Sequence, residues 1–211
     1  MVLRKVGLLA ALSVSATLMA GAAAFAMPGA ATGPGYTAGA EIGAAVSHGV
    51  TFAAAGDINY GLNLKLLNQP YTDVFADVLY TGRKFGGTTV NTTAIGVGLR
   101  QPIPIGGSIP ISVEGGFTNI SVNQGFGSSS SGFIGGRASF AQTSSGQITV
   151  MGRYMFTSPS AYQLGVGYSG VVGKGSGLTY QADYYHLGFN GGVGLDSDSI
   201  LVGVRFSGTG F

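Results

Sequence analysis

The sequence predicts an all-β fold: an antiparallel, up-and-down transmembrane β-barrel of ten strands, with eight strands as the alternative. Charged residues make up 9% of the chain, against about 25% in soluble domains, too few to wet the whole outside of a soluble domain. No window approaches the roughly 18 consecutive apolar residues of a membrane-spanning helix. Apolar and polar residues alternate with a period of two in segment after segment, which indicates strands with one apolar face. Strands cross a membrane when a closed barrel satisfies every backbone group.

The first 26 residues are expected to be a cleaved signal peptide. Arg4 and Lys5 precede a short apolar run at 6–20, and Ala24-Phe25-Ala26 has the small-x-small pattern of a cleavage site. The mature chain would then have 211 − 26 = 185 residues, which is one domain by length. Residues 27–35 predict a flexible lead-in, and residues 36–211 the barrel.

The mature composition excludes several classes of protein. Removing Arg4 and Lys5 leaves eight basic residues (10 − 2) against eight acidic ones, so no basic face for nucleic acid is expected. The chain has no cysteine, which excludes a disulfide scaffold. Glycine, at 39 of 211 residues, is far above its usual share of about 7%. Glycine is expected where side chains must be small inside a narrow, curved barrel.

Ten segments carry strand patterns. The clearest sets Ile58, Tyr60 and Leu62 against Asn59 and Gly61. The ten predicted strands are 36–46, 50–66, 71–81, 89–100, 108–121, 133–142, 147–157, 161–172, 178–190 and 199–211. The connections are expected to be tight on one side and mostly longer on the other. The longer set comprises 82–88, 191–198 and the serine-rich stretch 122–132, which is expected to be the longest polar loop.

The alternation divides polar from aromatic side chains. The residues expected to face inward carry a charge network, comprising Lys65, Asp73, Asp77, Arg100, Glu114, Arg137, Arg153, Asp183 and Arg205. Such charges must be paired or wet, so a filled lumen is favoured over an ion path. Aromatic side chains are expected in two girdles: Tyr80, Phe117, Tyr154, Phe156, Tyr162 and Tyr184 toward the outer rim, and Phe140, Tyr180 and Phe206 toward the inner rim.

The last segment, SILVGVRFSGTGF at 199–211, ends on Phe211. A secreted chain ending in an amphipathic strand and a terminal aromatic resembles the small Gram-negative outer-membrane β-barrels of the OmpA/OmpX-like type. The resemblance implies that the last strand pairs with the first, and that the barrel-assembly machinery reads Phe211. Phe211 falls on the polar parity of its strand, so the pattern needs a bulge at Gly208 or Gly210. Residues 76–116 also resemble the paired strands of YfaZ-type outer-membrane precursors.

The resemblance implies an outer-membrane location, with lipid and lipopolysaccharide as surroundings and both termini on the periplasmic side. The protein is expected to be a monomer with a structural or envelope role and no catalytic activity. A narrow passive channel is the alternative function, and a lipid-modifying enzyme is a less favoured one. A soluble periplasmic β-sandwich also competes. No catalytic set stands out, because His48 lies in a turn and His186 on the outward parity. Asp196 and Asp198 predict a solvated loop rather than a Ca²⁺ site, and no cofactor or metal is expected.

Overall fold

The computed structural model describes residues 35–62, 72–103, 111–140, 146–172, 177–191 and 194–209. Within them the chain forms ten strands: β1 (Gly35–Ala45), β2 (Thr51–Leu62), β3 (Thr72–Phe85), β4 (Thr88–Ile103), β5 (Ile111–Val122), β6 (Gly127–Phe140), β7 (Gly146–Met155), β8 (Ala161–Val171), β9 (Leu178–Phe189) and β10 (Ser197–Thr209). Among the described residues, no helix has the length and apolar character needed to cross a membrane.

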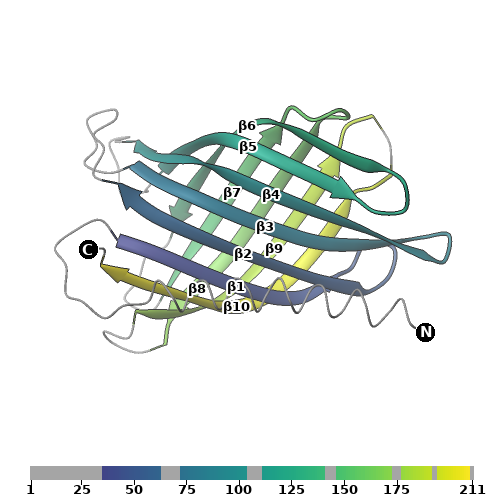
Figure 1. The fold of residues 1–211 in the computed structure, drawn as a ribbon. Helices are drawn as coiled ribbons and strands as arrows, with labels where there is room; N and C mark the ends of the chain where they lie inside the picture. Colours follow the sequence, from purple (N-terminus) through teal and green to yellow (C-terminus); the bar gives the residue numbers. More distant parts are fainter. Residues whose placement is uncertain are drawn as a thin grey trace.

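The ten strands close into one barrel (Figure 1). Each strand pairs antiparallel with its neighbours in sequence, and β1 pairs with β10. The predicted up-and-down barrel of ten strands is confirmed, and both the eight-strand alternative and the two-sheet sandwich are wrong. We call the end where β1 begins and β10 finishes the terminal end. The opposite end, where Gly86 and Gly87 join β3 to β4, is the hairpin end.

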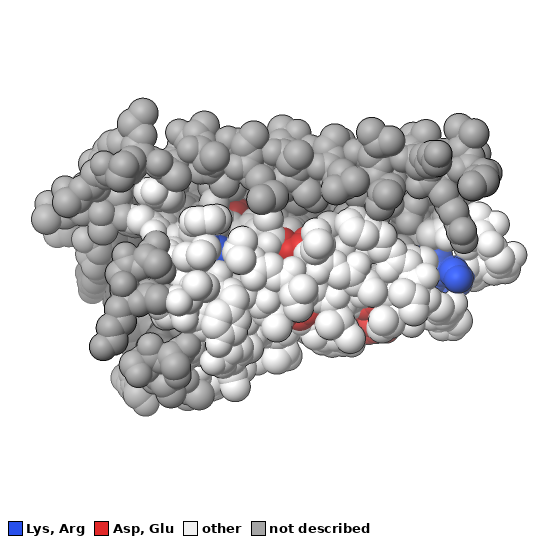
Figure 2. Space-filling view, turned by 90° about the horizontal axis from the view of Figure 1, so that it is seen from below, with Lys and Arg blue, Asp and Glu red and all other residues white. Residues whose placement is uncertain are grey.

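The outside of the barrel is apolar. Twelve of the large aliphatic and aromatic side chains at outward positions are 39–73% exposed. They are Ile42, Val74, Ile95, Val97, Leu99, Val113, Phe117, Ile134, Leu164, Val166, Ile200 and Val202. Figure 2 shows one face of the molecule, where most of the described surface carries no charged side chain. A continuous apolar band around a closed barrel is the lipid-facing surface of a transmembrane β-barrel.

The inside of the barrel has two zones. The half toward the hairpin end is packed mainly with apolar side chains, among which the hydroxyls of Thr81, Thr92, Ser197 and Ser199 are also buried. The apolar members are all less than 10% exposed: Ala45, Ala53, Leu79, Val90, Ala94, Ile120, Val122, Phe133, Met155, Ala161, Leu187, Phe189, Leu195 and Leu201, joined by Phe75 nearer the middle. We call this group the apolar plug. The middle and the half toward the terminal end carry the charged side chains. The sequence patterns predict a polar interior throughout, so the apolar plug is a finding of the structure.

The hairpin between β3 and β4 is longer than predicted. The strands pair up to Phe85 and Thr88, so the predicted loop at 82–88 is wrong. Only Gly86 and Gly87 form the turn, with φ angles of +52° and +86°. A two-residue turn with positive φ at both positions fits the right-handed twist of the strands, and glycine adopts it without strain.

The serine-rich stretch is also a strand. Ser128–Ser131 pair with residues of β5 from Ser121 to Thr118, so the predicted long loop at 122–132 is wrong. The ladder is made by backbone groups, which serine provides as well as valine does, and a strand that leaves the membrane needs no apolar face. Two of the three connections predicted to be longer, 82–88 and 122–132, are reduced to turns at 86–87 and 123–126. The predicted division into tight and longer connections is therefore also wrong.

The seam between β1 and β10 is regular. The register runs without interruption from Gly35 opposite Thr209 to Ala45 opposite Ser199, so the expected bulge at Gly208 is wrong. Gly210 and Phe211 lie outside the described residues, as do the predicted signal peptide and nearly all of the lead-in. The assembly role of Phe211 stays a prediction.

Candidate functional site

Glu114 lies at the centre of a chain of ion pairs that crosses the lumen. Arg100 Nε donates to Glu114 Oε2 at 3.1 Å, and Arg153 Nε donates to the other oxygen, Glu114 Oε1. Arg153 also donates from Nη1 to Asp77 Oδ2 at 2.6 Å. The four residues come from β3, β4, β5 and β7. Both oxygens of Glu114 therefore hold a guanidinium group, and the side chain is fully shielded from solvent.

From Arg100, the series of polar contacts continues to side chains of β2 and β10. Arg100 Nη1 donates to Asn59 Oδ1 at 2.8 Å, and Asn59 Nδ2 donates to Asp57 Oδ2 at 2.7 Å. Arg205 Nη2 lies 2.9 Å from each oxygen of Asp57. From Asp77 to Arg205 the chain holds three guanidinium groups and three carboxylates, so it is neutral. We call it the interior ion-pair chain.

Two phenylalanines complete the centre of the lumen. The guanidinium of Arg153 lies 5.0 Å from the ring centroid of Phe75 and 5.0 Å from that of Phe133. The guanidinium of Arg100 lies 4.7 Å from the ring centroid of Phe75. A guanidinium over an aromatic face is attracted by the ring quadrupole, the more so when water is excluded. The apolar plug and the interior ion-pair chain therefore meet at Phe75 and Phe133.

The sequence patterns predicted most members of the interior ion-pair chain but not all of them. Asp77, Arg100, Glu114, Arg153 and Arg205 were predicted to face inward and do so. Two inward carboxylates were missed. Asp57 has the same parity as Asn59, two residues later, and that spacing could have found it. Glu41 lies in a strand made mostly of glycine and alanine, where Ile42 alone offers apolar contrast between the two faces near it.

The other described residues of the predicted charge network do not belong to the interior ion-pair chain. Asp73 faces Arg100 across the β3–β4 ladder, toward the terminal end. Arg137 donates from Nη2 to Met151 Sδ at 3.8 Å. Asp183 accepts hydrogen bonds from Gln181 Nε2 at 3.2 Å and from the Tyr185 hydroxyl at 3.3 Å. Lys65 lies outside the described residues.

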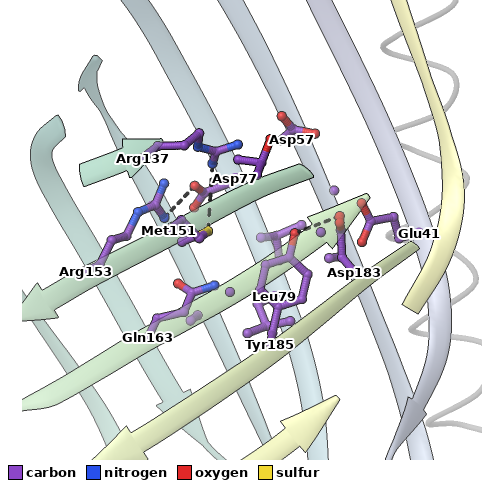
Figure 3. Close-up of a pocket in the computed structure, with 18 of the residues that line it drawn as sticks. Glu41, Asp57, Asp77, Leu79, Arg137, Met151, Arg153, Gln163, Asp183 and Tyr185 are labelled. Atoms are coloured by element: carbon purple, nitrogen blue, oxygen red, sulfur yellow. Dashed lines mark hydrogen bonds and ion pairs between the residues drawn. The ribbon is translucent and has the colours of Figure 1, made fainter. Parts of the chain in front are cut away.

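A cavity of about 970 Å³, partly continuous with open solvent, lies beside the interior ion-pair chain. Figure 3 shows Arg137, Arg153 and Asp77 on one side of it, and Glu41, Asp183 and Tyr185 on the other. Gly165 and Gly167 belong to its wall, and a Cβ at Gly167 would collide with Asp183 Oδ1. The absence of side chains at these two positions of β8 makes room for the polar groups of β9.

The comparisons with known proteins found likenesses in structure alone. No family model matches the chain, and no curated protein matches it. Among solved structures, it is similar to a major outer membrane protein from Thermus thermophilus (9% identity, 83% of this chain and 100% of that one, TM-score 0.41). It is also similar to the translocator domain of the autotransporter NalP from Neisseria meningitidis (13%, 92% and 94%, TM-score 0.42) and to Neisserial surface protein A (18%, 84% and 99%, TM-score 0.36).

What the chain is follows from its own architecture. Ten strands close without a free edge, the outward side chains are apolar, and the charged side chains of the spanning strands turn inward. The chain is a transmembrane β-barrel. Its location in an outer membrane stays a prediction. The YfaZ-type likeness of residues 76–116 stays a prediction, because no family model matches.

The nine aromatic residues predicted for the girdles all lie on the outward face of this barrel. Seven of them are clearly exposed: Phe117, Phe140, Tyr154, Phe156, Tyr180, Tyr184 and Phe206. Tyr80 and Tyr162 are half-buried. Phe117 lies midway along β5, so it faces the middle of the apolar band rather than a rim. The two-girdle arrangement itself stays a prediction.

A polar cluster on the barrel's outer surface gathers around Asp198, near the hairpin end. Asp198 Oδ1 accepts from the Tyr184 hydroxyl at 2.5 Å and lies 2.8 Å from His186 Nδ1. Asp198 Oδ2 accepts from the Ser47 hydroxyl at 2.9 Å. His186 Nε2 lies 3.3 Å from the Tyr162 hydroxyl. His186 lies outward as predicted, but its meeting with Ser47 and Asp198 was missed, because barrel closure brings them together.

The carboxylates of Asp196 and Asp198, near the hairpin end, are hydrogen-bonded to other groups of the barrel. Asp196 Oδ1 accepts from the backbone N–H of Phe189 at 2.9 Å, and Asp198 is occupied by the contacts above. Among the described residues, no group of three or more His, Cys, Asp or Glu could hold a metal ion.

Proposed function

We propose that this barrel lies in the outer membrane and has a structural role in the envelope, that it does not conduct, and that it is not an enzyme. The observation that supports this is the apolar plug across the hairpin half of the lumen. Leu187, Leu201 and Met155 are its most deeply buried large side chains, with 0–2% exposed. An ion that crossed this densely packed, mainly apolar segment would lose its hydration and gain few partners, because the buried hydroxyls of Thr81 and Ser199 already pair with each other.

The interior ion-pair chain supports the same proposal. It satisfies its own charges across the lumen, whereas a selectivity lining leaves charged groups free to meet an ion. We propose lipid and lipopolysaccharide as the surroundings of the barrel, a monomer as its state, and the barrel-assembly machinery as its transient partner.

A narrow channel is the second candidate. The observation in its favour is the charged cavity of about 970 Å³, which is partly continuous with open solvent. Conduction requires the cavity to continue through the apolar plug, so planar-bilayer recordings separate the two candidates.

The proposal predicts no steady conductance from the wild-type barrel. A variant with the plug hollowed by Met155→Ala, Leu187→Ala and Leu201→Ala is expected to conduct, because water can then fill the gap. The matched control carries Ile134→Ala, Val166→Ala and Ile200→Ala, which remove similar volumes from the outward face, and is expected to stay closed. Steady conductance of the wild-type protein would replace the structural proposal with the channel.

A further inference from the structure

Two carboxylates in the cavity form no ion pair among the described residues; the guanidinium of Arg205 attracts Glu41 from a distance but is hydrogen-bonded to Asp57. Glu41 on β1 and Asp183 on β9 lie side by side in Figure 3. Gln181 Nε2 donates to Glu41 Oε1 at 2.8 Å and to Asp183 Oδ2 at 3.2 Å, and the Tyr185 hydroxyl donates to Asp183 at 3.3 Å. All of these donors are neutral. No described ion pair includes either carboxylate.

One oxygen of Glu41 has no hydrogen-bond donor among the described residues, and the Glu41 side chain lies against that of Asp183. Glu41 is only 5% exposed, and its Oε2 is buried without a partner. Asp183 Oδ1 lies over Gly167, where a Cβ would collide with it, and both residues line the cavity. Buried carboxylates so close together repel each other, and either a proton shared between them or a bound positive charge relieves the repulsion.

Three of the four arginines that line the cavity already have carboxylate partners. Arg153, Arg100 and Arg205 are paired within the interior ion-pair chain. Arg137, on β6, contacts Met151 Sδ and has no carboxylate partner among the described ion pairs. The cavity therefore presents a pair of carboxylates and a separate guanidinium that are each free for a ligand.

The chemistry of the carboxylate pair favours an organic cation. Calcium takes six to eight oxygen ligands, and no described group of three or more acidic or histidine side chains is available here. A primary ammonium carries three N–H donors and no acceptor. It matches oxygens that can only accept, and the neutral Gln181 and Tyr185 already orient them.

We propose that the cavity binds the ammonium group of a small primary amine between Glu41 and Asp183. Two sources share this chemistry: a simple amine, and the zwitterion of an amino acid, whose carboxylate would reach toward Arg137. The inference goes beyond the proposed structural role and makes the cavity a binding pocket.

The first experiment uses the wild-type barrel, folded in detergent at pH 8, in isothermal titration calorimetry. Ethanolamine and glycine are the probes, and tetramethylammonium is the matched cation without N–H donors. We expect one ethanolamine per barrel and a dissociation constant at least about tenfold higher for tetramethylammonium, because one lost charge-assisted hydrogen bond is worth about that factor. No binding of ethanolamine would overturn the proposal and leave a proton shared between the carboxylates. Equal binding of the two cations would also overturn it.

Variants then locate the site. Glu41→Gln and Asp183→Asn are each expected to weaken ethanolamine binding at least about tenfold, because each removes one charged acceptor. Asp73→Asn is the matched control: it makes the same change at an inward carboxylate outside the cavity wall and should leave the affinity unchanged. Equal weakening by Asp73→Asn would overturn the site. If the two site variants do not fold, the wild-type comparison of the probes still decides.

The variant Arg137→Gln distinguishes the two classes of ligand, simple amines and zwitterionic amino acids. Weaker glycine binding with unchanged ethanolamine binding assigns the pocket to zwitterions, and no change in either assigns it to simple amines. Each outcome supports the ammonium site. Failure of amine binding leaves the bilayer test of the plug unaffected, and conductance of the wild-type protein leaves the calorimetry unaffected.

Discussion

Glu114 is the residue on which the interior ion-pair chain depends most directly. Its two oxygens accept from Arg100 and Arg153, and neither guanidinium can release its charge. Glu114→Ala would leave both arginines short of a partner in a buried place. We expect the free energy of unfolding in lipid vesicles to fall by about 3–5 kcal/mol, measured as a lower midpoint of denaturant unfolding.

The control for this prediction is Asp73→Asn, which changes an inward carboxylate that lies outside the described ion pairs. A loss of less than about 1 kcal/mol is expected, as for exposed pairs. Equal losses in the two variants would mean that lumen charge in general, and not the doubly paired Glu114, stabilises the barrel.

At the residue scale, alternation predicts the face of a side chain but not its partner. It placed Arg153 and Asp77 inward, yet it could not join them, because they lie on β7 and β3 and meet only across the lumen. The same limit hid the cluster of Ser47, His186 and Asp198. Glu41 was missed for a different reason: most residues around it on β1 are small, and with so little apolar contrast the parity of a strand cannot be read.

At the scale of elements, the seam between β1 and β10 decides whether the barrel is closed. Thr37 and Ser207 lie directly opposite each other across it, and opposed residues of an antiparallel pair have Cα atoms about 4.5–5.5 Å apart. That is within the range for a disulfide. The chain has no cysteine of its own, so Thr37→Cys with Ser207→Cys is expected to form one cross-link under mild oxidation.

The measurement is the mobility of the denatured chain on a non-reducing gel. The matched control pairs Thr37→Cys with Gly203→Cys, four residues along β10 and about 13 Å away, and it should stay uncrosslinked. A cross-link in the control, with none in the opposed pair, would show that the register of the seam is different.

The hairpins show where element boundaries escape the sequence. A drop in apolar content predicted loops at 82–88 and 122–132, but the strands extend well into both and leave turns only at 86–87 and 123–126. Backbone pairing persists beyond the apolar band because the ladder does not depend on the side chain, and a strand that leaves the membrane has no lipid to face. The turn signals themselves were sound: Gly86 and Gly87 hold the positive φ angles that a two-residue turn needs.

At the scale of the whole molecule, low charge together with alternation was enough to predict the barrel. The division of its lumen was not predictable. Leu187 and Gln181 share the inward parity of β9, and only the level at which each meets other strands places Leu187 in the apolar plug and Gln181 beside the cavity. That level depends on how the strands are staggered around the barrel, and this stagger cannot be predicted from the sequence of any single strand.

The orientation of the apolar face toward lipid is a property of the whole barrel. Val97 and Thr89 lie on the same face of β4, eight residues and about 26 Å apart, with Val97 near the middle of the strand and Thr89 beside the hairpin turn. An arginine facing the middle of a bilayer costs about 2–4 kcal/mol, and one at the interface about 0–1 kcal/mol. Val97→Arg is therefore expected to lower the free energy of unfolding in lipid vesicles by about 2–4 kcal/mol, and Thr89→Arg by less than about 1 kcal/mol. If both variants were equally stable, the outward valine and leucine rows would not face acyl chains, and the assignment of this face to the membrane would be wrong.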